Sequence, residues 1–222
     1  DPNPEVAGRG IAMLREAGIE VTVGLLEAEA LALNPGFISR MTRRRPFVRL
    51  KMAMSLDGRT AMQSGESQWI TGPAARQDVQ RLRARSCAIV TGVNSILLDD
   101  SALTVRESDL GISDSEWVQH IVARQPLRVV LDTKGRIPAS ARILTMPGKT
   151  IVATASNVTY DVDVSQWVLP TITIGQHERL DLTVLLQKLA DQQCNEVLIE
   201  AGATLAGAFV EQGLVDELVM YM

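Results

Sequence analysis

Residues 50–71 bring together side chains that could bind or activate a ligand. Apolar and polar residues alternate at the start of this stretch, which is typical of a strand with one apolar face and one face that carries Lys51. The Asp57-Gly58 pair predicts a tight turn. Small, polar and aromatic side chains then fill residues 65–69, just before a predicted helix. The stretch therefore predicts a hairpin that leads into a ligand-binding loop.

A second candidate is Glu200, which ends a predicted apolar strand at residues 197–200. A carboxylate in such a position is costly unless it has a partner. It either caps the next helix or pairs with an arginine, or it is held against a substrate hydroxyl. Lys51 is equally ambiguous, because a lysine on a half-exposed strand is usually solvated.

The residues after Glu200 predict a turn that opens a helix. Residues 202–207 are small and include one hydroxyl, and the free N–H groups at a helix start attract anions. Their G-x-x-x-x-G spacing is not a Rossmann fingerprint, and Ala208 and Phe209 stand where a P-loop needs Lys followed by Ser or Thr. The pattern predicts either a phosphate-binding turn or simple packing of a helix on a strand.

Arg83 and Arg106 would suit a ligand that carries a phosphate, because a guanidinium donates forked, charge-assisted hydrogen bonds. The alternative is a surface salt bridge, which adds little stability. The Asp99-Asp100 pair is weak support for Mg²⁺, and the two histidines are isolated, so the zinc spacing is missing. We predict no metal site in this chain.

Composition and charge narrow the class of protein. The 222 residues are 46% hydrophobic, which suffices for a sizeable core. A net charge of −4 lacks the basic field that non-specific nucleic-acid binding needs, and no apolar run approaches the ~18 residues of a membrane span. The two cysteines give no disulfide framework. We expect a cytoplasmic protein that binds neither nucleic acid nor membranes, and we interpret the chain as a piece of a longer protein.

Strands that alternate with helices indicate an α/β sheet. Residues 43–46, Arg-Arg-Arg-Pro, predict a linker between a first region at 1–46 and a second at 47–222. Residues 107–125 look irregular, apart from a turn near Trp117. The predicted strands begin near residue 47 and cover residues 19–23, 88–92, 127–133, 150–154, 167–169, 172–174, 197–200 and 215–222. The predicted helices cover residues 3–18, 25–33 and 72–85, one that Asp181 caps, and one that ends near Gly213.

Three stretches carry a resemblance that spacing alone does not give. LKMAMSLDGRTAMQSGESQWITGPAAR, VTGVNSILLDDSALTVR and VLIEAGATLAGAFVEQGLVDEL resemble the reductase domain of the bacterial bifunctional riboflavin-biosynthesis deaminase/reductase. This resemblance covers residues 47–222. NPEVAGRGIAMLREAGIEV and LNPGFISRM resemble the end of the zinc-dependent deaminase domain of the same family, whose metal signature, H-x-E with P-C-x-x-C, has no counterpart here. Zinc is thus expected only in a missing part of the parent protein.

The resemblance implies a dihydrofolate-reductase-like fold with a mixed sheet flanked by helices, preceded by the remnant of a cytidine-deaminase-like α/β domain. It implies NADPH as the hydride donor, 5-amino-6-(5-phosphoribosylamino)uracil as the substrate, and a homo-oligomer. Lys51 and Glu200 are the candidates for catalysis. Residues matched to the substrate are Ser67, Arg83, Leu103, Arg106 and Glu200. Residues matched to the cofactor are Met54, Trp69, Ser95, Asp99, Thr133, Gly202, Ala203, Thr204, Leu205, Ala206, Gly207 and Ala208.

Two other functions remain open at this point. Another reductase with this fold could act on a different pteridine or pyrimidine, although a substrate without phosphate would not need both Arg83 and Arg106. A non-catalytic nucleotide-binding fragment is the third reading.

Overall fold

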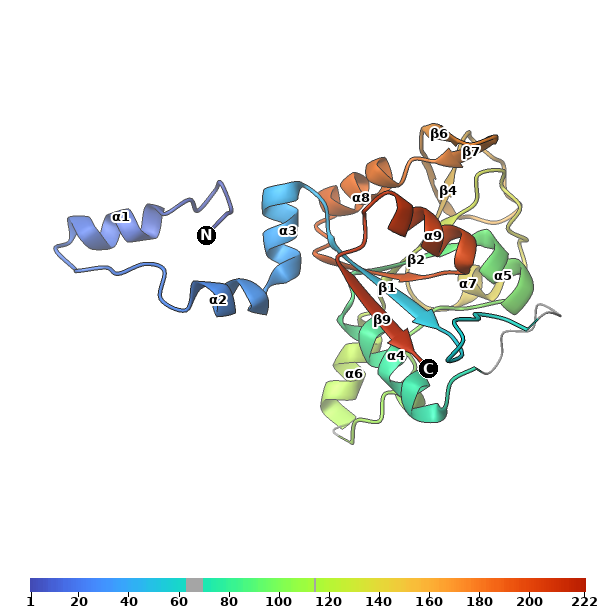
Figure 1. Ribbon diagram of the computed structural model, residues 1–222, viewed down its shortest axis with the longest axis horizontal. Helices are drawn as coiled ribbons and strands as arrows, with labels where there is room; N and C mark the ends of the chain where they lie inside the picture. The colour runs from blue at the N-terminus through green and yellow to red at the C-terminus, as the bar shows by residue number, and fades with distance from the viewer. Residues whose placement is uncertain (63–69, 114) are drawn as a thin grey trace.

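The computed structural model describes residues 1–62, 70–113 and 115–222. In this described part, the central feature is a seven-stranded sheet in the order β5-β4-β3-β2-β8-β1-β9, and a separate two-stranded sheet pairs β6 with β7 (Figure 1). The strands are β1 Phe47–Ala53, β2 Ala88–Gly92, β3 Leu127–Leu131, β4 Thr150–Thr154, β5 Ser165–Val168, β6 Thr171–Ile174, β7 His177–Leu180, β8 Glu196–Glu200 and β9 Glu217–Tyr221.

Every neighbouring pair in the large sheet is parallel, and only β6 and β7 are antiparallel. The predicted α/β class with helices around a sheet is confirmed, but the described sheet is parallel rather than mixed. The apolar runs in β2 and β3 explain this, because parallel strands are covered by helices on both faces and are buried throughout.

Helices connect these strands. They are α1 Arg9–Glu16, α2 Glu27–Leu33, α3 Pro35–Arg43, α4 Pro73–Arg85, α5 Val93–Asp99, α6 Ser115–Ala123, α7 Arg142–Thr145, α8 Leu182–Asp191 and α9 Ala203–Glu211, with a 3-10 turn at Glu107–Asp109. Asp181 caps α8 as predicted, since its carboxylate accepts hydrogen bonds from the N–H groups of Thr183 and Val184.

Two apolar cores lie on opposite faces of the sheet. On one face, α8 and α9 pack against alternate residues of the strands, including Val197 and Ile199 of β8. On the other face, α4, α5 and α7 pack against the intervening residues, including Leu198. The period of two in a strand therefore places Arg49, Lys51 and Glu200 on the face that α4 covers.

The sequence patterns miss some elements. Residues 19–23, predicted as a strand, are irregular, because an extended segment needs a neighbour and none lies beside them in the described chain. Helix α6 falls in the stretch that looked irregular, and β7 was not predicted. The turn at Ser55–Arg59 forms as predicted, with the N–H of Ser55 donating to the carbonyl of Arg59, but no return strand follows it in the described residues.

Helices α1 and α2 bury none of their residues against the described chain, and Figure 1 shows them apart from the sheet. Helix α3 is different. A Cβ added at Gly36 would lie 2.7 Å from the carbonyl oxygen of Asn195, so this helix sits directly on the end of the sheet. The predicted linker also contacts the second region, because Arg43 and Arg45 both form salt bridges with Asp216, just before β9.

Candidate active site

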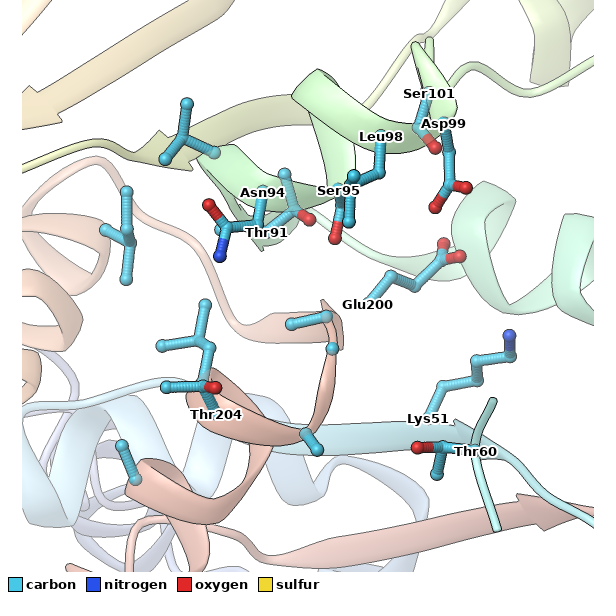
Figure 2. Close-up of a pocket in the computed structure, with 18 of the residues that line it drawn as sticks. Lys51, Thr60, Thr91, Asn94, Ser95, Leu98, Asp99, Ser101, Glu200 and Thr204 are labelled. Carbon is cyan, nitrogen blue, oxygen red and sulfur yellow. The ribbon is translucent and has the colours of Figure 1, made fainter. Parts of the chain in front are cut away.

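A cavity of about 630 Å³ lies at the carboxyl ends of β1, β2, β3 and β8. In parallel α/β sheets this edge is where ligands bind, and the volume lies within the range of small-molecule sites. Figure 2 shows helix α5, with Asn94 and Ser95, on one side of the cavity and Thr204 at the start of α9 on the other.

Lys51 and Glu200 come from neighbouring strands. They are paired in the parallel register of β1 with β8, so they lie side by side at the same height in the sheet. Both line the cavity, and in Figure 2 the two side chains reach into the same end of it. A cation and a carboxylate are thus held together at the edge where a ligand would enter.

Glu200 is also tied to α4. Its two carboxylate oxygens accept hydrogen bonds from Nε and Nη2 of Arg83, at 2.6 and 2.9 Å, and Nη1 of Arg83 donates to the carbonyl of Thr104 at 3.1 Å. Both side chains are nearly buried. Burial alone would raise the pKa of Glu200, but the Arg83 guanidinium outweighs it, with help from Lys51, and holds that pKa below its usual value.

This pair decides one of the alternatives that the sequence left open: Glu200 does pair with an arginine. Because its pKa is lowered, Glu200 is a carboxylate at neutral pH and accepts hydrogen bonds rather than donating a proton. Each of the three guanidinium nitrogens of Arg83 donates one hydrogen bond, two to Glu200 and one to Thr104. Its side chain lines the cavity as a member of a fixed pair.

The turn after β8 forms an open cradle. Gly202 is the N-cap of α9 and, having no side chain, it offers no capping hydrogen bond to the helix start. A Cβ added at Gly202 would meet nothing within 4 Å, and the backbone N–H groups of Ala203 and Thr204 have no hydrogen-bond partner among the described residues. Free N–H groups at the positive end of a helix suit a phosphate.

The structure brings most of the predicted site residues to this one cavity. Those that line it are Lys51, Arg83, Ser95, Asp99, Leu103, Thr133, Glu200, Gly202, Ala203, Thr204, Leu205 and Ala208. Ser67 and Trp69 lie outside the described residues.

Four predicted residues are described but do not line the cavity. The backbone N–H of Met54 is bonded to Tyr221, just past β1. Ala206 is buried in the core beneath α9, and Gly207 follows it on the same helix. Arg106 is half exposed and pairs with Asp109 at 2.6 Å, which is the surface salt bridge that the sequence allowed as its alternative role.

Four further residues line the cavity: Arg136 and Arg179, which sequence reasoning missed, and Thr91 and Asn94, which it placed at a candidate strand end without a role of their own. Thr91 is fully buried in β2 and its hydroxyl has no hydrogen-bond partner in the described structure. Its place at a predicted strand end was the available signal. Arg179 had none, because the short polar strand that carries it was not recognised.

Metal sites and membrane-spanning helices have no counterpart among the described residues. No group of three or more His, Cys, Asp or Glu side chains there could hold a metal ion. Among the helices described, none is both long and apolar enough to cross a membrane.

Comparison with known proteins connects this cavity to a family. A family model described as the RibD C-terminal domain matches residues 46–222. The riboflavin biosynthesis protein RibD of Escherichia coli K12 is 48% identical over 225 residues, and that of Haemophilus influenzae Rd is 43% identical over 229. Both matches cover 100% of this chain, but only 60% and 59% of the relatives' own lengths. The chain thus spans about three fifths of the curated relatives that it matches.

Solved structures of RibD proteins resemble this chain in fold as well as in sequence. Acinetobacter baumannii RibD, form 1, superposes with a TM-score of 0.81 at 48% identity, covering 99% of this chain and 58% of that one. A diaminohydroxyphosphoribosylaminopyrimidine deaminase/5-amino-6-(5-phosphoribosylamino)uracil reductase from Thermotoga maritima gives 0.78 at 30% identity, covering 98% and 56%. The Saccharomyces cerevisiae riboflavin biosynthesis reductase Rib7, at 18% identity and a TM-score of 0.60, covers 84% and 80% and shows a shared fold alone. The chain belongs to the RibD C-terminal domain family.

Proposed function

We propose that this chain reduces the ribosyl group of 5-amino-6-(5-phosphoribosylamino)uracil to the ribityl product, with NADPH as the hydride donor. The observation that carries the proposal is the cavity itself. Lys51 and Glu200 lie on neighbouring strands at one end of it, and the N-terminus of α9, whose first N–H groups have no described partner, lies beside them. One solved relative is named as a 5-amino-6-(5-phosphoribosylamino)uracil reductase.

The residues present fit a dinucleotide. The open space at Gly202 allows a pyrophosphate to approach the backbone closely, and the free N–H groups of Ala203 and Thr204 would meet its charge. Ser95 and Asp99 on α5 offer polar groups from the opposite wall. When bound, the nicotinamide supplies the hydride, and the protein aligns the sugar with it and excludes water.

Lys51 has the polarising role in this proposal. Its cationic side chain reaches the cavity from β1, where it can stabilise negative charge on the ribose oxygen as the sugar opens to accept hydride. It also gives the reaction a group that can hand a proton to that oxygen.

Glu200 has the orienting role. Both of its oxygens are already held by Arg83, and the lowered pKa keeps it ionised, so it would accept a hydrogen bond from a substrate hydroxyl and fix the direction of Lys51. Proton delivery thus falls to Lys51 rather than Glu200. Ser67, Leu103 and Arg106 complete the proposed substrate side, with Arg83 acting there through Glu200.

The experiment that tests the function is NADPH oxidation by the purified chain, followed by absorbance. The phosphorylated, deaminated pyrimidine is compared with dihydrofolate and with a substrate that lacks the phosphate. We expect turnover with the first only. Faster turnover of dihydrofolate would favour another reductase of this fold, and nucleotide binding without turnover would favour a non-catalytic module.

The parent protein is proposed to be bifunctional. Residues 1–46 would then be the end of a deaminase domain whose zinc site lies in a part of the parent outside this chain. The observation in support is that the chain matches only 60% of the length of its E. coli relative. Expression of the longer gene product, with a zinc assay and a deaminase assay, tests this directly.

A further inference from the structure

The basic side chains that line the cavity differ in how closely they are paired with carboxylates. Arg83 is locked to Glu200, and Lys51 stands beside the same carboxylate in the sheet register. Arg136 and Arg179 also line the cavity, but neither makes a short ion pair within the described chain. These two arginines are the part of the cavity that the proposed chemistry does not use.

Arg179 lies on β7 and is half-buried. Its Nε is buried without any hydrogen-bond partner in the described structure, and its guanidinium makes no ion pair there. Leaving a buried charged donor unsatisfied costs free energy, so native proteins rarely do so without a reason such as a ligand. Here the donor belongs to a side chain that faces the cavity.

Arg136 follows β3. Its Nε lies 3.5 Å from Oδ1 of Asp132, which is too long for a strong hydrogen bond, and its side chain is 49% exposed. The other oxygen of Asp132 accepts from the N–H of Ile137 at 2.8 Å. Gly135 shapes the turn between them with φ +67°, and a Cβ there would lie 2.6 Å from Val158. The loop is therefore fixed, while the guanidinium at its end stays available.

The strand order sets how far this end of the cavity is from the proposed chemistry. β3 is separated from β8 by β2, and from β1 by β2 and β8. At ~4.8 Å between strands, Thr133 and Arg136 stand roughly 10–15 Å from the Glu200 and Lys51 strand ends. The free N-terminus of α9 follows β8 directly, two residues after Glu200, and lines the same cavity. This spacing suits a dinucleotide with its nicotinamide by Lys51, its pyrophosphate at α9 and its adenosine by β3.

We propose that Arg136 and Arg179 form a subsite for the 2′-phosphate on the adenosine ribose, and so select NADPH over NADH. The inference rests on the proposed function and deepens it. Two guanidinium groups offer a phosphate several forked, charge-assisted hydrogen bonds. The phosphate would in turn satisfy the buried Nε of Arg179 and replace the loose contact of Arg136 with Asp132.

The test measures binding of adenosine 2′,5′-bisphosphate and of AMP by titration calorimetry, without turnover. The full 222-residue chain is compared with Arg136→Ala, Arg179→Ala and the double variant. We expect each single change to weaken the bisphosphate by about 10-fold or more, since a hydrogen bond to a charged group is worth about 1.5–3 kcal/mol. AMP should bind with unchanged affinity, which also shows that the variants fold.

Arg142→Ala is the matched control, because Arg142 is exposed at the start of α7 and does not line the cavity. It should leave both affinities unchanged. Arg179→Met provides a second variant that keeps the apolar volume of the stem, and it should reproduce the loss seen with alanine.

Three outcomes would overturn the inference. If the double variant keeps the preference for the bisphosphate over AMP, the 2′-phosphate binds elsewhere and the proposed function stands. If the variants instead lose affinity for ribose 5-phosphate, the two arginines serve the substrate phosphate. If the unaltered chain binds neither nucleotide nor NADP⁺, the proposed function fails and the subsite fails with it.

Discussion

Arg83 and Glu200 are 117 residues apart in the chain, yet they form a bidentate, nearly buried ion pair that fastens helix α4 to the end of β8. Lys51 stands next to this pair in the sheet. Glu200, the carboxylate beside Lys51 in the described structure, therefore has a fixed position and a fixed negative charge before any ligand binds. Preorganised charge of this kind is effective because it needs no rearrangement during the reaction.

Replacing Lys51 with Met should remove the polarising group while preserving the length of the side chain. We expect kcat to fall by about 100-fold or more, with little change in the affinity for NADP⁺. Steady-state NADPH oxidation and a separate binding titration would measure the two effects. Lys149→Met, at a site remote from the cavity, serves as the control. An unchanged kcat in the Lys51 variant would refute the role.

Replacing Glu200 with Gln should leave Arg83 as a buried charge without its partner. The expected loss is about 3–5 kcal/mol in the free energy of unfolding, measured by urea denaturation. The control is Asp109→Asn, which breaks the exposed pair with Arg106 and should cost less than about 1 kcal/mol. Equal losses in the two variants would show that the buried pair is not a fixed element of the structure.

The same variant predicts a change in pH dependence. Because the pKa of Glu200 is lowered in the folded state, the unfolded state takes up a proton first as the pH falls. The stability that Glu200 contributes is complete above the unfolded pKa, about 4.3, and is lost as the pH drops toward the folded value. Unfolding free energies from pH 7 to pH 3 should therefore fall less steeply for Glu200→Gln than for the unaltered protein. Parallel curves would contradict this.

Gly202 and Gly72 allow a matched test of the α9 cradle. Both are N-cap residues with extended backbone angles, and a Cβ at either would meet nothing within 4 Å. Gly202→Val should fold but fill the space proposed for the pyrophosphate, so the Kd for NADP⁺ should rise about 10-fold or more while ribose 5-phosphate binding persists. Gly72→Val should leave the Kd for NADP⁺ unchanged. Equal effects of the two changes would remove α9 from the cofactor site.

Removing the cap of α8 gives a test of the fold alone. Asp181→Ala should lower the free energy of unfolding by about 1 kcal/mol, because two backbone N–H groups lose their acceptor. Asp191→Ala, at the last residue of the same helix, removes a carboxylate from the end where negative charge is unfavourable, so it should be neutral or slightly stabilising. Thermal denaturation of both variants measures the difference. A cap that contributes nothing would give similar melting temperatures.

Much of this architecture could be predicted from local patterns. The apolar runs at 88–92 and 197–200 indicated buried strands, and the helical spacing after Asp181 indicated α8. Glu200 and the turn after it, at the end of one of these strands, were already candidates for a ligand site, and the carboxyl ends of strands in open α/β sheets are where ligands generally bind. These signals lie in short windows of sequence, so they can be recognised without knowing the fold.

The failures have a different origin. The sequence allowed Glu200 to pair with an arginine but could not say which one, because the choice of Arg83 depends on where α4 crosses the sheet. Helix α6 fully buries Val118 and packs Ile121 and Val122 at the edge of a small separate core, and its short apolar pattern was overlooked in a polar stretch. Strand β7 is polar and mostly exposed, so its pairing with β6 creates the element and places Arg179 on the cavity.

The position of β1 in the sheet has a consequence for the order in which the molecule assembles. Its two neighbours, β8 Glu196–Glu200 and β9 Glu217–Tyr221, come more than 140 residues later in the chain, so β1 cannot pair with either until those residues have been made. Closing so long a loop is slow, because its entropy is lost before any contact is gained. Lys51 and Glu200 thus come together only after β8 has been synthesised, so a nascent chain that ends before β8 cannot form this part of the cavity.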